Sequence, residues 1–196
     1  MKGITSLGYT VFDEGIGDHS YSDMDGDTNI ITIAADMAAS KGILVVNSIG
    51  NLGNDEWYYM SAPADGDSVL AVGSVDVFRQ SSGFSSHGPT VDLRVKPNVS
   101  AQGQGTFIAN VGGGYLNSNG TSFSAPLIAG MAACMWEYWR EMDPGFTNME
   151  LIALMESRSS LYPFSNADMG YGIPDFQKAL WPLDITETEG IEGIEV

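Results

Sequence analysis

The sequence of 196 residues has few basic groups and a single cysteine. Eight Lys and Arg against 25 Asp and Glu give a net charge of −17, which cannot form the basic surface that nucleic-acid binding requires. Because Cys134 is the only cysteine, no disulfide can form within the chain. No apolar run reaches the roughly 18 residues that a membrane span needs. We therefore expect no nucleic-acid partner, no membrane span and no internal disulfide.

Composition is typical of one globular domain with glycine-rich loops, since 43% of residues are hydrophobic, 17% are charged and 24 are glycine. The acids concentrate in two stretches, six between Asp13 and Asp27 and five after Trp181. We interpret both as solvated segments. The prediction is a domain over residues 1–180, followed by an acidic, mobile tail over residues 181–196.

The stretch Asn119–Pro126 runs directly into the apolar segment Leu127–Trp139. A glycine turn followed by Ser122 in the first turn of a long helix is how a fold can present a nucleophile. Backbone N–H groups and the helix dipole at such a place would stabilise an oxyanion formed beside Ser122. An ordinary N-cap before a core helix is the alternative that spacing alone leaves open. Cys134, inside the apolar segment, is expected to be buried and inert.

Three strands are predicted from apolar runs. Ile43–Val46 is β-branched, apolar and bounded by a helix and a glycine turn, which is typical of a parallel strand buried on both faces. Gly3–Leu7 and Val69–Gly73 are the other two. Ile30–Ser40 is predicted to be an amphipathic helix with Thr28 as its N-cap.

Two further helices are predicted near the end of the chain. Thr147 and Glu150 have the spacing of a capping box, which predicts a helix to about Ser159. Asp175 can cap a short helix that ends at Leu180.

Two polar stretches are candidates for function. Asn47–Asn54 follows a predicted parallel strand, and ligands of open parallel sheets gather at the carboxyl ends of strands. Asp23–Asp27 invites a calcium interpretation, but Gly26 falls at the fourth position of the loop where an EF-hand needs it at the sixth. Ala34 occupies the position where that loop needs Glu. We assign no metal site.

The run Gly120-Thr121-Ser122-Phe123-Ser124-Ala125-Pro126 resembles the nucleophile signature of the subtilisin-like serine peptidases, the subtilases. Ser6-Leu7-Gly8 and Gly50-Asn51 resemble two further family motifs and occur in the family's order. Lys96-Pro97-Asn98 resembles a scaffold stretch, with Asn98 where Asp is common. The likeness covers nearly all of the chain. It implies a subtilisin-like α/β fold, a doubly wound, mostly parallel sheet flanked by helices, of which this chain lacks the N-terminal part.

The resemblance assigns roles to individual residues. Ser122 is the expected nucleophile, and the side-chain amide of Asn51 and the backbone N–H of Ser122 are the expected oxyanion-hole donors. The residues expected to bind substrate are Ser6, Leu7, Gly8, Ser48, Ile49 and Gly50. Another class of serine hydrolase, the esterases, is disfavoured because the Gly-x-Ser-x-Gly elbow is absent around Ser122.

A serine nucleophile needs a base and a group that orients the base. His19 and His87 are the only histidines, and neither lies in the family's His motif. The resemblance implies that the catalytic Asp and His belong to an upstream part that this sequence does not contain. We therefore expect the chain alone to be inactive. A pseudopeptidase or a peptide-binding module is the alternative.

The expected partners are a peptide or protein substrate and the missing N-terminal part of the catalytic domain. An uncovered sheet edge also predicts self-association, so a homo-oligomer is possible. No cofactor is identifiable from the residues, although the resemblance allows a structural calcium ion. The resemblance also implies secretion or a cell-envelope location, while the first residues do not have the form of a signal peptide.

Overall fold

A computed structural model of the chain describes residues 2–5 and 18–180. Its centre is a four-stranded parallel sheet in the order β1-β2-β3-β4. The strands are β1 (Lys2–Thr5), β2 (Leu44–Ser48), β3 (Val69–Val75) and β4 (Val99–Gln102). The three predicted strands are confirmed as members of one parallel sheet. Ser6, Leu7, Gly8 and the predicted acidic tail lie outside the described residues.

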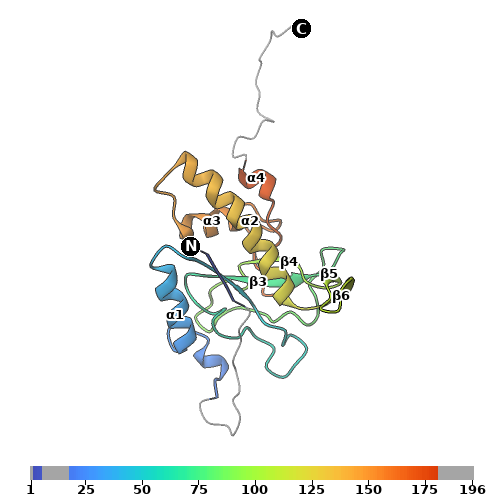
Figure 1. Cartoon of the computed structure of the whole chain (residues 1–196). Helices are drawn as coiled ribbons and strands as arrows, with labels where there is room; N and C mark the ends of the chain where they lie inside the picture. The colour runs from blue at the N-terminus through green and yellow to red at the C-terminus, as the bar shows by residue number, and fades with distance from the viewer. Residues whose placement is uncertain (1, 6–17, 181–196) are drawn as a thin grey trace.

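Helices cover both faces of this sheet, as the doubly wound prediction requires (Figure 1). On one face lies α1 (Ile30–Ala39), and on the other lie α2 (Thr121–Met142) and α3 (Asn148–Ser157), followed by the short α4 (Phe176–Leu180). A 3-10 turn, η2 (Tyr21–Asp23), precedes α1.

The strands divide their side chains between the two faces because successive residues of a strand point in opposite directions. Leu44 and Val46 of β2 pack in the larger core with α2 and α3, whereas Val45 packs toward α1. Every residue of β2 and β3 is buried. This two-sided burial explains the continuous apolar runs Leu44–Val46 and Val69–Val72 within these strands.

The start of α1 differs from the prediction. Asn29, not Thr28, is the N-cap residue, and the helix begins at Ile30. The Thr28 hydroxyl instead donates to the carboxylate of Asp25 at 2.8 Å, and the same carboxylate accepts from the backbone N–H of Asp27 at 2.9 Å. Asp25 therefore closes the turn before the helix and binds the Thr28 hydroxyl, and the N-cap position falls to the next residue, Asn29.

The prediction of a buried Cys134 is wrong, because its side chain is exposed. The core-facing side of α2 is formed by Ala125, Ile128, Ala129, Ala132 and Met135, all of them buried. Cys134 lies on another side of the helix. A sequence that is apolar all round does not reveal which side of a helix is covered.

The predicted ends of the chain's last helices are correct to within two residues. Thr147 caps α3 in a capping box with Glu150, and the Thr147 hydroxyl accepts from the Glu150 N–H at 3.2 Å. The carboxylate of Asp175 accepts from the backbone N–H of Lys178 at 3.1 Å at the start of α4.

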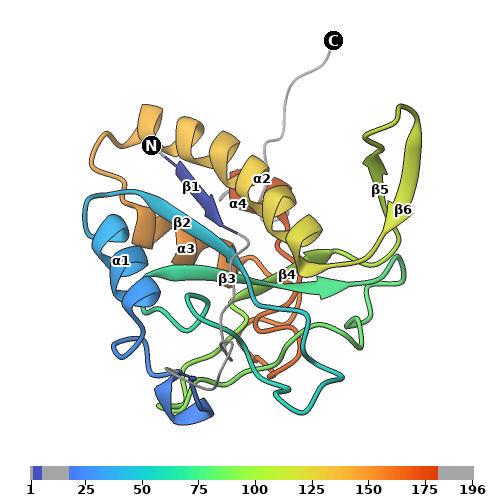
Figure 2. The same cartoon turned by 60° about the horizontal axis from the view of Figure 1, so that its bottom comes forward.

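A two-stranded antiparallel hairpin, β5 (Thr106–Ala109) and β6 (Tyr115–Ser118), was not predicted. It connects β4 to α2. Figure 2 shows that it stands apart from the four-stranded sheet, beside the N-terminal end of α2. Among the residues that the structure describes, no helix is long and apolar enough to cross a membrane.

Candidate active site

The N-terminus of α2 is built on two glycines. Gly120 is the N-cap residue with φ 155°, and its N–H donates to the carbonyl of Gly103 at 2.8 Å. Gly103 has no room for a side chain, because a Cβ there would come within 2.7 Å of the Gly120 carbonyl oxygen and closer still to Ser124. Ser122 is the second residue of the helix and is partly exposed. The hydroxyl is thus held in the first helical turn, as expected.

Asn51 is brought to this helix end from seventy residues away in the sequence. Its Oδ1 accepts two hydrogen bonds from Thr121, one from the backbone N–H at 2.8 Å and one from the hydroxyl at 2.9 Å. Because both bonds go to the oxygen, the Nδ2 group is oriented as the donor of the amide toward the space near Gly120. The Nδ2 group lies near the start of α2, since a Cβ added to Gly120 would be 3.8 Å from it.

Thr121 is the member of the site that the sequence analysis did not identify. Its side chain is fully buried, and both of its donors are used on Asn51. The available signal was a hydroxyl residue directly before Ser122. The buried position makes Thr121 a positioning residue for Asn51.

The loop that carries Asn51 needs glycine at position 50. Gly50 has φ +116°, and a Cβ added there would lie 2.8 Å from the hydroxyl oxygens of both Ser61 and Ser86. Ser86 fastens the loop on both sides, since its N–H donates to the Gly50 carbonyl and its hydroxyl accepts from the Leu52 N–H, each at 3.0 Å. These bonds fix the path of the backbone into Asn51.

The predicted substrate residues Ser48 and Ile49 lie directly before this loop. Ser48 is buried with 6% exposure, and Ile49 is fully buried in a cluster with Met24 and Met60. The Ile49 N–H donates to Val72, and its carbonyl accepts from Ser61. The Ile49 side chain therefore faces the interior and does not reach a surface.

His87 lies in an ordered cluster and not in a free loop. Its Nδ1 is 2.8 Å from Oδ1 of Asp168, and its ring stacks on Tyr58 with centroids 4.1 Å apart. Its backbone pairs with Tyr58 and Met60. The sequence analysis did not foresee the partner, which is 81 residues away. The Nδ1 side of the His87 ring is thus bound to the loop that contains Asp168.

Lys96 anchors the loop before β4 from inside the protein. Its ammonium group is buried and donates to the carbonyls of Gly66 and Val69 at 2.8 and 2.7 Å. Burial lowers the pKa of Lys96 to about 8. Asn98 accepts from Lys96 and from the N–H of Ala71, and it donates to Glu156 at 2.7 Å. An amide at position 98 can thus donate to a carboxylate, which the Asp common at this place could not do when ionised.

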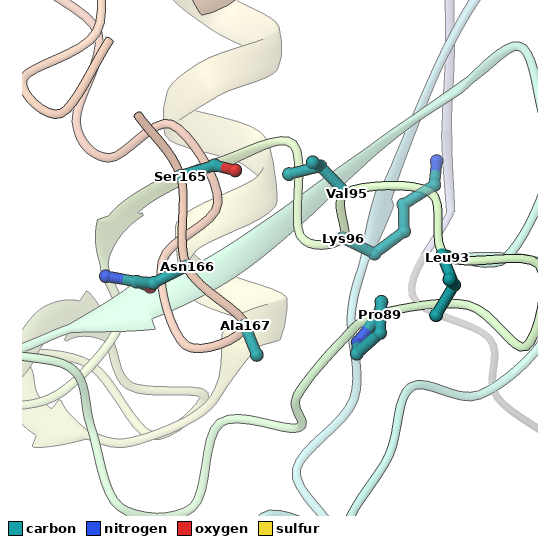
Figure 3. Close-up of a pocket in the computed structure, with 7 residues that line it drawn as sticks. All are labelled: Pro89, Leu93, Val95, Lys96, Ser165, Asn166 and Ala167. Carbon is teal, nitrogen blue, oxygen red and sulfur yellow. The ribbon is translucent and has the colours of Figure 1, made fainter. Parts of the chain in front are cut away.

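A cavity of about 220 Å³ lies between the loop of Pro89 to Lys96 and the loop of Ser165 to Ala167. Figure 3 shows the Lys96 ammonium group pointing away from the segment Ser165–Ala167. The cavity contains none of the predicted catalytic or substrate-binding residues.

The acidic stretch around η2 is engaged in local bonds. Asp25 closes the turn before α1, and its backbone carbonyl accepts from Arg94 at 2.7 Å. In the described part of the chain, no three His, Cys, Asp or Glu residues are grouped so that they could hold a metal ion. A structural calcium ion stays a prediction that rests on the resemblance alone.

Comparison with known proteins identifies the subtilase family. The model of the subtilase family matches residues 5–172. A subtilisin of Bacillus pumilus is 34% identical over 79% of this chain and 52% of its own length. A thermostable alkaline protease of Halalkalibacterium halodurans is 31% identical over 63% of this chain and 31% of its own length. The chain thus spans about a third to a half of the length of these relatives.

A solved structure, MycP1 from the ESX-1 type VII secretion system, has a TM-score of 0.60 over 79% of this chain and 46% of its own. The sequence identity is 24%, so this likeness bears on the fold alone. It supports the subtilisin-like arrangement of sheet and helices.

Proposed function

Because the chain belongs to the subtilase family, we propose that it carries the nucleophile and the oxyanion hole of a serine endopeptidase. The observation that carries the proposal is the pair of hydrogen bonds from Thr121 to Asn51 Oδ1, which turns the amide donor of Asn51 toward the helix end that bears Ser122. A preorganised donor of this kind contributes only when negative charge develops on the carbonyl oxygen.

The proposed reaction begins with attack of Ser122 Oγ on the peptide carbonyl carbon, while a general base takes the hydroxyl proton. The carbonyl oxygen becomes an oxyanion, which accepts hydrogen bonds from Asn51 Nδ2 and from the Ser122 N–H. Collapse of this intermediate breaks the C–N bond, and the base returns the proton to the leaving amine. Water then hydrolyses the acyl-enzyme by the same steps.

We propose that the base and its orienting acid come from polypeptide upstream of this sequence. Neither histidine of the chain lies in the family's His motif. Removing the base of subtilisin costs about as much as removing its whole triad, on the order of 10⁶ in kcat. This chain alone should therefore be inactive.

The uncovered side of α2 supports a partner segment of this kind. Leu127, Met131, Tyr138 and Met142 follow one another at helical spacing, with exposures of 48%, 38%, 36% and 69%. A cavity of about 460 Å³ lies beside them and is lined also by Phe176 and Leu180. An apolar stripe along a central helix is energetically unfavourable in water, so the upstream part of the domain would cover it. Without that part, self-association would cover the same apolar stripe.

The test is hydrolysis of a fluorogenic peptide by the chain, by its Ser122→Ala variant, and by each of these mixed with a separately produced upstream segment. We expect no hydrolysis by the chain alone and hydrolysis by the mixture that requires Ser122. If the unmixed chain cleaves the peptide and Ser122→Ala does not, the upstream base is refuted. A mixture that binds the peptide without cleaving it would favour the peptide-binding alternative.

A further inference from the structure

The β5–β6 hairpin presents aromatic and aliphatic side chains to solvent. Phe107 and Tyr115 are 69% and 72% exposed, and their rings stack with centroids 5.2 Å apart. Val111 at the tip is fully exposed, and Leu116 on the opposite face is 39% exposed. So much apolar surface on a two-stranded projection is unusual unless something binds to it.

This surface is also free of charge, in contrast to the rest of the protein. No Lys, Arg, Asp, Glu or His occurs between Lys96 and Glu137, a segment that includes the hairpin and the start of α2. Elsewhere the chain carries a net charge of −17. An uncharged patch in a strongly acidic protein favours apolar groups as ligands over charged ones.

The hairpin is fastened directly to the residues that precede Ser122. The N–H of Gly105 donates to Asn119 Oδ1 at 2.7 Å, and the N–H of Gly120 donates to the carbonyl of Gly103 at 2.8 Å. Tyr115 is the first residue of β6 and lies four residues before Asn119, which is about 13 Å of extended chain at about 3.3 Å per residue. Asn119 is three residues before Ser122. An extended peptide covers this distance with roughly four residues.

The sheet order indicates which part of a substrate lies on this side. β1 and β4 form opposite edges of the sheet, and the hairpin continues from β4. Ser6-Leu7-Gly8, which are expected to bind the acyl part of the substrate, follow β1. If the acyl part lies beside β1, the leaving-group part extends toward β4, the edge from which the hairpin continues.

We propose that Phe107 and Tyr115 form a binding surface for an aromatic or large aliphatic side chain of the polypeptide substrate, about four residues after the scissile bond. This rests on the proposed function, because the substrate is placed by Ser122. The stacked rings also hold the hairpin together, as cross-strand aromatic pairs do. Their exposure shows that this stacking leaves most of each ring open to a ligand.

The test measures binding and needs no catalysis. The Ser122→Ala chain is titrated with two labelled peptides, one with Phe and one with Ser at the fourth position after the scissile bond, by fluorescence anisotropy. The hairpin variant Phe107→Thr/Tyr115→Thr places Thr, a β-branched residue that favours strands, at both positions, so that the hairpin can form. The control Phe164→Thr removes a Phe of similar exposure, 79%, from a distant loop. Thermal melts by circular dichroism check that the variants fold.

We expect the Phe peptide to bind about tenfold more tightly than the Ser peptide, and the hairpin variant to bind the Phe peptide about tenfold more weakly. Phe164→Thr should leave both affinities unchanged. Equal affinities for the two peptides, or a loss of the same size in Phe164→Thr, would overturn the inference. Hairpin-dependent flotation with phosphatidylcholine vesicles and no preference between the peptides would overturn it in favour of a lipid surface.

The proposed function has a separate readout, the labelling of Ser122 by a fluorophosphonate in the unaltered chain with its upstream segment. Labelling without hairpin-dependent binding rejects this inference alone. Hairpin-dependent binding without labelling rejects the proposed catalysis and leaves the hairpin as a peptide-binding surface.

Discussion

Replacing Thr121 by Val tests whether this buried hydroxyl orients the oxyanion hole. Val has nearly the shape of Thr and removes one of the two hydrogen bonds to Asn51 Oδ1, the 2.9 Å bond from the hydroxyl. The 2.8 Å bond from the backbone N–H remains, so Asn51 is loosened and not released. The perturbation should therefore act on the transition state and much less on substrate binding.

The magnitude follows from the bond that is lost. One neutral hydrogen bond contributes about 0.5–1.5 kcal/mol net, which corresponds to a 2- to 13-fold decrease in rate when the bond acts fully in the transition state. Asn51→Leu should cost far more, because it removes the donor itself. In subtilisin, a member of the same family, loss of that donor lowers kcat by roughly 10²–10³-fold.

The assay is steady-state hydrolysis of a peptide by the chain together with its upstream segment. Thr121→Ser restores the hydroxyl and should recover most of the rate. Thr147→Val is the matched control, because it removes a Thr hydroxyl from the cap of α3 and should lower stability without changing kcat. A Thr121→Val variant with unchanged kcat, or with a change only in KM, would refute the positioning role.

Two further predictions concern the scaffold. Gly50→Ala should lower the free energy of unfolding, measured by urea titration, by about 1–3 kcal/mol more than the control Gly42→Ala. Both glycines have positive φ, but only at Gly50 would a Cβ meet Ser61 and Ser86. Equal losses of stability in the two variants would contradict this packing. The pKa of Lys96 is lowered from 10.5 to about 8 by burial, so the unfolded chain binds more protons between these values and stability should rise with pH there, by up to about 1.4 kcal/mol per pH unit. Lys96→Met should lack this rise, and an identical pH profile would show that another group causes it.

The main elements of the fold could be predicted because their signals are local. β2 and β3 are buried on both faces and contain the apolar runs Leu44–Val46 and Val69–Val72, and the cap of α3 is a pair of residues three apart. The signature around Ser122 fixed the start of α2 for the same reason. An element can be predicted from sequence when the residues that stabilise it are close to it in the chain.

Features that depend on distant partners were not predictable in this way. Thr121 and Asn51 are seventy residues apart, and His87 and Asp168 are 81 residues apart. Cys134 was assigned to the core because the segment Leu127–Trp136 of α2 is apolar on every side, and only packing against the sheet decides which side is covered. The hairpin escaped notice because its strands are short, glycine-rich around the turn and largely exposed.

The most direct test of the account is intact mass spectrometry after incubation with a fluorophosphonate probe, on the chain and on Ser122→Ala, with and without the upstream segment. The account predicts one adduct, on Ser122, only when the segment is present. Labelling of the chain alone that is lost in Ser122→Ala and in His87→Ala would contradict it, because a base within this chain would then activate the serine.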